Sequence, residues 1–551
     1  MTKLVLFDLG GVVATTPQFA IQSYSWETGV PVSLLQKLFL PSNENQPMWQ
    51  LETGKISLSQ FFVSASELIS NLAEEEGIKL PPRFSLKTLF DQLYKTIKVV
   101  PEMLNAAAAL KANGFRTCIV SNNWTDDTET GQHVSGLSLI RPYFDDFFES
   151  CKIGIRKPDP EMYKLVCKKF KVQPNEVLFL DDLPSNLAPA KEMGMATILV
   201  KDPISALRTV KEITGIDVLK AYPTPACTPS SVPHSIVQLK TGIMMHYVDI
   251  GHGHPIILLH GFPELWYIWK YQIPALAGAG YRVIAPDLRG YGQTSSPHDI
   301  SEYSRELFTN DIISLMDLLL LRQVAVIGHD WGGMVAWDLA LHHPDRIRAV
   351  ANMTPFMPPN PDINPLLGLK AKPGVFQYQL YFHQEGPPEA EFEKDLRRTF
   401  KLFLRNASEM EQIKLSTSDV LERGGFFVGT PEKVERSCMI TEEDLDYFVE
   451  NFRKTGFRGP LNWYRNMEVD WKWNLKIHPR KILQPVLMIT SGKDPVILPA
   501  FAANMGAHVP NLSLAHIEES SHFTPIDRPL ELNNMLLDWL KRIYGSETSK
   551  L

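Results

Sequence analysis

The chain has 551 residues with a formal net charge of −7, and 44% of its residues are hydrophobic. This length exceeds that of most single domains and predicts two or more. The negative charge argues against general binding to nucleic acid or anionic membranes, and no apolar run is long enough to span a bilayer.

Two features of the sequence concern the compartment of the protein. The five cysteines are scattered, odd in number and without the spacing of a metal site, which favours a reducing compartment. Asp8 interrupts the first apolar run almost at once, so the N-terminus lacks the pattern of a secretory signal peptide. We therefore expect a cytoplasmic protein.

The N-terminal half contains three short apolar runs that we predict to be buried strands, Leu4–Phe7, Thr117–Val120 and Val177–Leu180. Each run ends directly in polar residues, and active sites in open parallel sheets lie beyond the carboxyl ends of strands. The segment from about 15 to 98 has a helical pattern and lies between the first two strands, as an inserted cap would.

Polar residues suited to phosphoryl transfer follow these strands. This route needs a carboxylate nucleophile, a positive charge, hydrogen-bond donors for phosphate, and Mg²⁺ held by oxygen ligands. Asp8 supplies the carboxylate and Lys157 the charge. Ser121 and Asn122 follow the second strand as donors, and Asp181-Asp182 ends the third.

Together with the segment Phe7-Asp8-Leu9-Gly10-Gly11-Val12, this set resembles the haloacid dehalogenase superfamily of phosphatases. The resemblance implies a Rossmann-like α/β domain over residues 1–220 with a helical cap. It also implies an Mg²⁺ site formed by Asp8, Asp182 and the backbone carbonyl of Gly10.

The sequence departs from that family at Gly10. The family pattern, Asp-x-Asp, has a second aspartate there that acts as general acid and then as base. Loss of such a group costs about 10²–10⁴-fold in rate. We therefore expect a folded domain with weak or no phosphatase activity, used for structure or dimerisation.

A proline-rich segment separates the two halves of the chain. Residues 222–235 include Pro223, Pro225, Pro229 and Pro233 among small polar residues. Such a stretch is expected to form neither helix nor sheet ladder and is typical of a semi-rigid linker. We place the linker at 221–235 and a second domain at 236–551.

Six apolar runs in the C-terminal half are predicted strands, and helical patterns separate them. They are Pro255–Leu259, Val283–Pro286, Val324–Ile327, Val350–Met353, Val486–Thr490 and Leu512–Ile517. The interruption from about 358 to 484 holds aromatic-rich helical segments and no clear core strand. An insertion between late strands is where a helical lid belongs.

The segment Gly328-His329-Asp330-Trp331-Gly332-Gly333 follows one of these strands and precedes a helical pattern. Strand, glycine-flanked turn and helix are the context of a nucleophile elbow, in which serine usually occupies the centre. An aspartate is ionised at neutral pH, so it can attack an sp3 carbon directly and form an ester. The motif therefore indicates epoxides or alkyl halides as substrates.

An orienting acid and a base should complete such a site. Asp494 follows one strand and His522 follows the last, so the order nucleophile, acid, histidine agrees with this fold. We interpret His516, which lies within a strand, as a core residue. His329 cannot easily face the same side as Asp330, and we interpret it as packing against its neighbours.

Two backbone N–H groups are expected to form an oxyanion hole. One belongs to Trp331, directly after the nucleophile. The other belongs to Phe262 in His260-Gly261-Phe262-Pro263-Glu264, where Pro263 fixes the turn.

The insertion contains residues that distinguish epoxide hydrolysis from the hydrolysis of alkyl halides. Opening an epoxide creates an alkoxide that needs a proton donor, whereas a halide leaves as an anion. Tyr378 and Tyr464 both lie in the insertion, and a phenol with a pKa of about 10 stays protonated and can donate. By spacing alone, packing is the commoner role for each tyrosine.

The elbow, the oxyanion loop and the two lid segments resemble the mammalian-type soluble epoxide hydrolases, a bifunctional family, and the resemblance covers nearly the whole chain. It implies an α/β-hydrolase domain with a helical lid and no cofactor at that site. It further implies a nucleophile, its orienting acid and a water-activating base: Asp330, Asp494 and His522. Tyr378 and Tyr464 would be the paired acids, with Tyr381 as a nearby alternative to Tyr378.

The resemblance implies epoxy fatty acids and xenobiotic epoxides as substrates, and a homodimer. Apolar residues near the expected site also favour a hydrophobic substrate: Phe262, Trp331, Met334, Phe382 and Trp463. Two alternatives stay open. A haloalkane dehalogenase shares the elbow and the oxyanion loop, and a non-catalytic binding protein would retain the scaffold alone.

The sequence ends in Ser549-Lys550-Leu551. A C-terminal tripeptide of this kind is a peroxisomal address that an import receptor reads. We therefore expect the protein in peroxisomes as well as in the cytoplasm.

Overall fold

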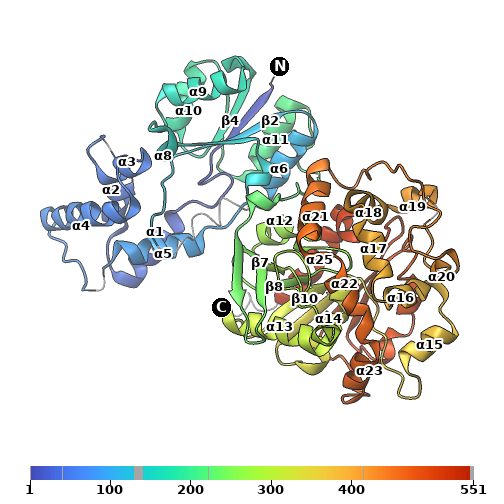
Figure 1. Cartoon of the computed structure of the whole chain (residues 1–551). Helices are drawn as coiled ribbons and strands as arrows, with labels where there is room; N and C mark the ends of the chain where they lie inside the picture. Colours follow the sequence, from blue (N-terminus) through green and yellow to red (C-terminus); the bar gives the residue numbers. More distant parts are fainter. Residues whose placement is uncertain are drawn as a thin grey trace. The chain divides into compact units, whose positions relative to one another are not determined.

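The computed structural model describes residues 2–39, 41, 43–82, 84–128, 140–220, 222–413 and 415–545. The chain divides into two compact units, coloured along the sequence in Figure 1. The first comprises Met1–Ser231 with Gly278–Gly280, and the second Val232–Ala277 with Tyr281–Leu551. The tripeptide 549–551 lies outside the described residues. No helix among the described residues is both long and apolar enough to cross a membrane.

The first unit contains a sheet of five parallel strands in the order β3-β2-β1-β4-β5. The strands are β1 (Leu4–Phe7), β2 (Arg116–Ser121), β3 (Asp146–Glu149), β4 (Val177–Asp181) and β5 (Ala196–Leu199). The three predicted strands are the three central ones, β1, β2 and β4. Each is buried along nearly its whole length, which is why it is a continuous apolar run.

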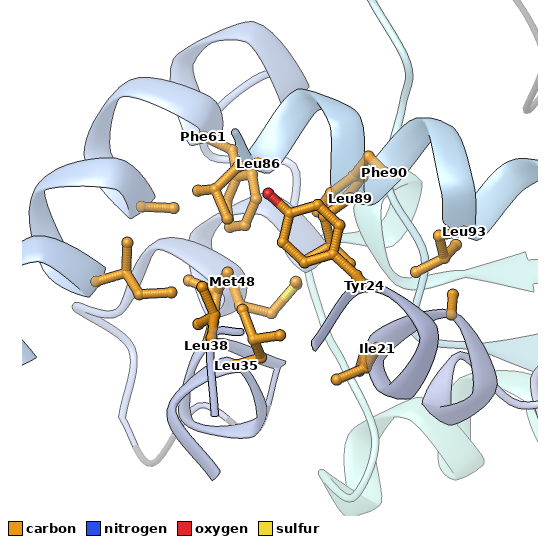
Figure 2. Close-up of a cluster of buried hydrophobic side chains, with 14 of the residues drawn as sticks. Ile21, Tyr24, Leu35, Leu38, Met48, Phe61, Leu86, Leu89, Phe90 and Leu93 are labelled. Carbon is orange, nitrogen blue, oxygen red and sulfur yellow. The ribbon is translucent and has the colours of Figure 1, made fainter. Parts of the chain in front are cut away.

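Helices cover this sheet and form a separate cap. The helices that follow the cap in the chain belong to the sheet domain: α6 (Pro101–Ala112), α8 (Ser150–Ile153), α9 (Pro160–Phe170), α10 (Pro184–Glu192) and α11 (Pro203–Thr214). The cap helices are α1 (Gln18–Thr28), α2 (Val32–Phe39), α3 (Pro47–Glu52), α4 (Leu58–Glu75) and α5 (Leu86–Thr96). The expected cap at about 15–98 corresponds to this helical group, which has an apolar core of its own (Figure 2).

The second unit contains a sheet of eight strands in the order β13-β12-β11-β10-β8-β9-β7-β6. The strands are β6 (His234–Gln238), β7 (Met244–Ile250), β8 (Pro255–Leu259), β9 (Arg282–Pro286), β10 (Val324–Gly328), β11 (Ile347–Asn352), β12 (Val486–Ser491) and β13 (Leu512–Ile517). The strands from β13 to β9 are parallel, and β7 joins them as an antiparallel strand. All six predicted strands are present in this sheet.

The helices beside this sheet include two that bear on the candidate site, α13 (Arg305–Leu318) and α14 (Trp331–His342). The others are α12 (Gln272–Gly278), α24 (Thr524–Asp527) and α25 (Pro529–Tyr544).

Between β11 and β12 the chain forms a helical insertion, as predicted. Its α-helices are α15 (Pro365–Ala371), α16 (Gln377–Phe382), α17 (Pro387–Glu393), α18 (Leu396–Phe403), α19 (Ala407–Ile413), α20 (Val420–Arg423), α21 (Glu442–Thr455), α22 (Arg458–Asn462) and α23 (Met467–Leu475). The short 3₁₀ helix η7 (Trp463–Asn466) follows α22.

Two local expectations were wrong. His234 and Ser235 pair with Val248 and Tyr247, so the end of the proline-rich segment belongs to an edge strand. Both residues follow the last proline of the segment and keep their backbone N–H groups. His516 is not a core residue: its side chain is 43% exposed because β13 is an edge strand, and its Nε2 lies 2.9 Å from Oε2 of Glu518.

Candidate active sites

Asp330 occupies the turn between β10 and α14, at the carboxyl edge of the larger sheet. Its φ of +48° is a conformation that non-glycine residues rarely adopt, and such strain is concentrated at functional sites. Glycine is needed on both sides of the turn. A Cβ on Gly328 would lie 2.6 Å from the Cα of Gly333, and one on Gly332 would lie 2.2 Å from the carbonyl oxygen of Leu259. The elbow therefore has the predicted form.

The structure brings Asp330, Asp494 and His522 together. His522 Nδ1 lies 2.9 Å from Asp494 Oδ2, and His522 Nε2 lies 3.9 Å from Asp330 Oδ2. The other oxygen of Asp494 accepts hydrogen bonds from the backbone N–H groups of Val496 and Ile497. One imidazole nitrogen thus faces an anchored carboxylate, and the other faces the elbow.

Electrostatic interactions within this triad shift the pKa of each member. Burial lowers the pKa of His522, but the charges of Asp494 and Asp330 outweigh it and raise the value to about 9. Burial disfavours the ionised form of Asp494, but His522 and the two backbone donors bring its pKa below 3.8. For Asp330, burial dominates and raises the pKa, although the charges of His522 and His329 oppose it.

The expected oxyanion loop lies against the nucleophile. The Phe262 N–H donates a 2.8 Å hydrogen bond to Asp330 Oδ1, and a Cβ on Gly261 would lie 2.4 Å from the Asp330 Cβ. The other expected donor, the Trp331 N–H, belongs to the first residue of α14, where backbone N–H groups have no partner within the helix. The loop donor therefore binds the carboxylate, and the other expected donor directly follows the nucleophile in the chain.

His329 does more than pack against its neighbours, which corrects the sequence-based interpretation. Its Nδ1 lies 2.8 Å from Glu264 Oε1, and its Nε2 lies 2.7 Å from the backbone carbonyl of His522. The remaining oxygen of Glu264 accepts a hydrogen bond from the Gly261 N–H. Glu264 and His329 are almost completely buried and connect the oxyanion loop to the loop of the catalytic histidine candidate.

Two helices of the insertion bring their tyrosines to the same site. Tyr378 on α16 and Tyr464 on η7 are 6% and 2% exposed, and their ring centroids are 6.1 Å apart. Burial raises the pKa of both phenols, so both are protonated at neutral pH. Tyr381, the alternative, does not line the cavity beside Asp330, whereas Tyr378 and Tyr464 do.

That cavity has a volume of about 440 Å³ and runs between the sheet and the insertion. Trp331 and Met334 line it, in agreement with the apolar character expected of the site. The aromatic rings of Phe262 and Phe382 instead pack against Tyr464, with centroids 5.4 and 5.1 Å from its ring. Most residues of the lining are apolar or aromatic, which suits a hydrophobic ligand.

The first unit carries a second cluster at the carboxyl ends of its central strands. Lys157 Nζ lies 2.7 Å from both Asp8 Oδ1 and Asp181 Oδ2. Asp8, Asp181 and Asp182 offer oxygens within 4.8 Å of one another, a donor set suited to Mg²⁺. Burial, reinforced by the two neighbouring aspartates and opposed by Lys157, raises the pKa of Asp8 to about 7.

The other expected residues of this cluster have distinct surroundings. The side chain of Asn122 is engaged with the backbone of Lys157, to which its Oδ1 and Nδ2 bond at 2.8 and 3.0 Å. Ser121 is buried, with its Oγ 3.3 Å from the Asn122 carbonyl. At Gly10 an added Cβ would meet no atom within 4 Å, whereas one on Gly11 would lie 2.2 Å from Asp182 Oδ2. Position 10 therefore has room for a side chain.

Comparison with known proteins agrees with both units. Residues 2–194 match the haloacid dehalogenase-like hydrolase family, and residues 254–529 match the alpha/beta hydrolase fold family. Bifunctional epoxide hydrolase 2 of Sus scrofa is 45% identical over 548 residues, covering 98% of this chain and 97% of that protein. The Rattus norvegicus protein of the same name is 44% identical with the same coverage. The chain belongs to the bifunctional epoxide hydrolase family.

Solved structures agree with the family assignment for the second unit. An epoxide hydrolase from Vigna radiata is 32% identical, with a TM-score of 0.52, and is matched over 99% of its own chain and 57% of this one. Epoxide hydrolase A from Mycobacterium thermoresistibile is 34% identical, with a TM-score of 0.51 and coverage of 98% and 56%. The expectation of a family member with two α/β domains is thus confirmed.

Sequence reasoning missed the roles of two residues in this bifunctional epoxide hydrolase family member. Glu264 was noted only as part of a turn, and no local pattern in the sequence indicates its pairing with His329. Asp181 was not among the expected metal ligands. Its oxygens accept hydrogen bonds from Asn186 and Lys157, so it anchors the lysine while lying within reach of the metal site.

Proposed function

We propose that this chain hydrolyses hydrophobic epoxides to vicinal diols through a covalent ester on Asp330. The observation that carries the proposal is the convergence of one carboxylate and two protonated phenols, those of Tyr378 and Tyr464, on a single cavity. The names of the relatives, all epoxide hydrolases, support the same reaction.

In the first step, Asp330 Oδ2 attacks an epoxide carbon and the carbon–oxygen bond of the ring breaks. Tyr378 or Tyr464 donates a proton to the departing oxygen, because an alkoxide is too basic to leave unprotonated. The product is a hydroxyalkyl ester. The Phe262 N–H holds the other carboxylate oxygen and so presents Oδ2 to the cavity.

In the second step, His522 takes a proton from water, which attacks the carbonyl carbon of the ester. Asp494 orients the imidazole and stabilises its protonated form. The developing oxyanion is held by the N–H groups of Phe262 and Trp331. The ester carbon–oxygen bond then breaks, and the protonated His522 gives its proton to the leaving alkoxide, so the diol departs. The acid formed on Asp330 gives its proton to the tyrosinate left by the first step, which restores the phenol and the carboxylate.

The two tyrosines distinguish this function from haloalkane dehalogenation. A halide leaves as a stable anion and requires no proton. Buried phenols beside the nucleophile would therefore have no catalytic role as proton donors in that reaction. The intact triad likewise distinguishes it from a binding protein without catalysis. We propose epoxy fatty acids and xenobiotic epoxides as substrates, in keeping with the apolar lining of the cavity.

For the first unit we propose Mg²⁺ binding with weak or no phosphatase activity. Asp8, Asp182 and the backbone carbonyl of Gly10 would hold the ion, which supplies positive charge to a phosphoryl group when bound. Lys157 balances the charge of Asp8 and Asp181. Gly10 offers no side chain to transfer a proton, and a structural or dimerisation role is proposed instead.

We also propose that the protein is a homodimer that divides between cytoplasm and peroxisomes. A fluorescent fusion that carries residues 549–551 at its C-terminus tests the address directly, with deletion of Leu551 as its control. Sedimentation of the purified protein tests the dimer. A monomer would contradict the proposed dimer. A fusion whose distribution in the cell is unchanged by the deletion would contradict the proposed peroxisomal address.

Diol formation from a hydrophobic disubstituted epoxide tests the main proposal. We expect turnover by the wild type and none by Asp330→Ala. Chloride release from a haloalkane in the absence of epoxide turnover would instead establish the dehalogenase. No turnover of either substrate by the wild type would support the binding protein.

A further inference from the structure

Part of the cavity lining is polar, and the proposed mechanism does not use it. Arg305, Asp338, Asp470 and Asn474 all line the cavity that contains Asp330. They come from α13, α14 and α23 and contact one another, so we call them the polar cluster. An epoxide with two plain alkyl ends has no group that would interact with them.

Arg305 is fixed by a bidentate ion pair. Its Nε and Nη2 each lie 2.6 Å from an oxygen of Asp338, which has no exposed surface. Among the described residues, the third guanidinium nitrogen, Nη1, has no hydrogen-bond partner. The Arg305 side chain retains 15% exposure and lines the cavity, so this donor remains for a ligand.

Asp470 has one bound oxygen and one unbound oxygen. Its Oδ1 accepts a 2.8 Å hydrogen bond from the backbone N–H of Arg305. Its Oδ2 has no hydrogen-bond partner in the described part of the chain. The residue is 4% exposed and lines the cavity. Burial, opposed by Arg305 and reinforced by Asp338, raises its pKa to about 7. Asp470 Oδ2 is not one of the fully enclosed atoms without a partner, so this acceptor is accessible to a ligand in the cavity.

The distance from the nucleophile to the polar cluster follows from helix geometry. Asp330 precedes α14, and Trp331, Met334 and Asp338 recur along that helix at the spacing of one face. Asp338 lies eight residues after Asp330, on the order of 12 Å at 1.5 Å per residue. An extended chain of roughly ten bonds of about 1.5 Å each, laid in a zigzag, covers that distance.

We infer that the polar cluster is a specificity subsite for an uncharged hydroxyl group carried by the substrate roughly ten bonds from its epoxide. The inference rests on the proposed epoxide hydrolysis. A hydroxyl both donates and accepts, so it can pair with the Arg305 Nη1 donor and the Asp470 Oδ2 acceptor at once. A methyl end would leave both unpaired, and a carboxylate end would face the Asp470 carboxylate.

Three matched epoxides test the subsite. They share one chain length and differ only in a hydroxyl, methyl or carboxylate end roughly ten bonds from the ring. At a pH above the pKa of Asp470, we expect the hydroxyl compound to exceed the other two in kcat/KM by roughly 10- to 100-fold, the effect of two buried hydrogen bonds. Equal values, or a preference for the carboxylate, would overturn the inference.

Two variants separate recognition from a structural role. Asp470→Asn keeps an oxygen for the backbone N–H of Arg305 but loses the second acceptor, so the ratio of kcat/KM for the hydroxyl compound to that for the methyl compound should fall about tenfold. The paired change Arg305→Met with Asp338→Leu removes both members of the ion pair together, so neither is left without the other. It removes the Arg305 Nη1 donor, so it should also lower the hydroxyl advantage about tenfold. Unchanged preference in both variants would overturn the inference.

A binding measurement distinguishes failure of the subsite from failure of the proposed function. Calorimetry of the wild-type protein compares a long-chain alcohol with its methyl ether, neither of which contains an epoxide. The ether has no proton to donate to Asp470, so we expect the alcohol to bind roughly tenfold more tightly, and Asp470→Asn to remove the difference. Turnover of the methyl epoxide with equal affinity for alcohol and ether would overturn the subsite alone. A selective alcohol site without any epoxide turnover would instead overturn only the proposed function.

Discussion

The Nε2 atom of His522 lies 3.9 Å from Oδ2 of Asp330, too far for a hydrogen bond but close enough for the two charges to interact. The ionised Asp330 is one of the groups that raise the pKa of His522 to about 9, against the effect of burial and together with Asp494. Formation of the ester removes that charge. The pKa of His522 should therefore fall in the intermediate, where the histidine has to accept a proton from water.

This relationship predicts different pH profiles for the two steps. Ester formation requires ionised Asp330, so kcat/KM should decline only on the acid side. Where ester hydrolysis limits turnover, kcat should rise with pH as His522 loses its proton, with an apparent pKa below 9. Rapid-quench measurements of both steps across pH test this. A rate of ester hydrolysis that does not change with pH between about 6.5 and 9 would contradict this prediction.

Replacing the histidine should trap the ester. In His522→Gln the first step remains available, because Asp330 and the tyrosines are unchanged, but no base activates water. We expect steady turnover to fall by about 10²–10⁴-fold. Intact-mass analysis should show the protein heavier by one epoxide molecule, and the double variant with Asp330→Ala should show no adduct. Absence of an adduct from His522→Gln would falsify the two-step route.

The tyrosines should affect only the first step. Tyr378→Phe and Tyr464→Phe each leave one phenol, so each should slow ester formation by roughly 10- to 100-fold, and the double variant should lose nearly all activity. Tyr381→Phe is the matched control, since Tyr381 is on the same helix but does not line the cavity. Single-turnover rates provide the measurement. A similar loss in all three single variants would point to packing rather than proton donation.

The sequence predicted the central strands of both sheets and missed most strands at or near the edges. β1, β4 and β10 are buried throughout, so each is a plain apolar run. β6 exposes four of its five residues and carries no such signal, and β5 buries only one of its four. The tertiary position of an edge strand, rather than its own composition, determines its conformation.

The candidate site was predictable where a residue acts through its position after a strand. Asp330, Asp494 and His522 all follow strands of one parallel sheet, so their proximity follows from topology. The pairing of Glu264 with His329 was not predictable, because these residues are 65 positions apart and meet only through the packing of two loops. The polar cluster likewise joins three helices whose contacts no local pattern reveals.

The buried pair of Glu264 and His329 should contribute to stability. Glu264→Ala leaves a buried histidine without its carboxylate, and such losses cost roughly 3–5 kcal/mol. The denaturant midpoint of the second unit should fall accordingly. Glu518→Ala is the matched control, because it breaks the exposed pair with His516 and should leave the midpoint unchanged. Equal effects of the two substitutions would show that the buried pair contributes no more to stability than the exposed pair.

The surroundings of Gly10 predict that phosphatase activity can be restored by one substitution. A side chain at position 10 meets no atom within 4 Å of its Cβ, so Gly10→Asp should fold and supply the missing acid and base beside Asp8. We expect Mg²⁺-dependent hydrolysis of an aryl phosphate to rise by about 10²–10⁴-fold over the wild type. The gain should disappear in the double variant with Asp8→Asn.

Gly11→Asp provides the control for this gain. Gly11 has a φ of +80°, and its added Cβ would lie 2.2 Å from Asp182 Oδ2, so the same carboxylate one residue later cannot be accommodated. Only Gly10→Asp should therefore gain activity, and calorimetric Mg²⁺ titration should show that it still binds the ion. If Gly10→Asp folds and binds Mg²⁺ but stays inactive, the missing aspartate is not what limits phosphatase activity. The amide of Asn122, which is held by the backbone of Lys157, would then be the limiting feature.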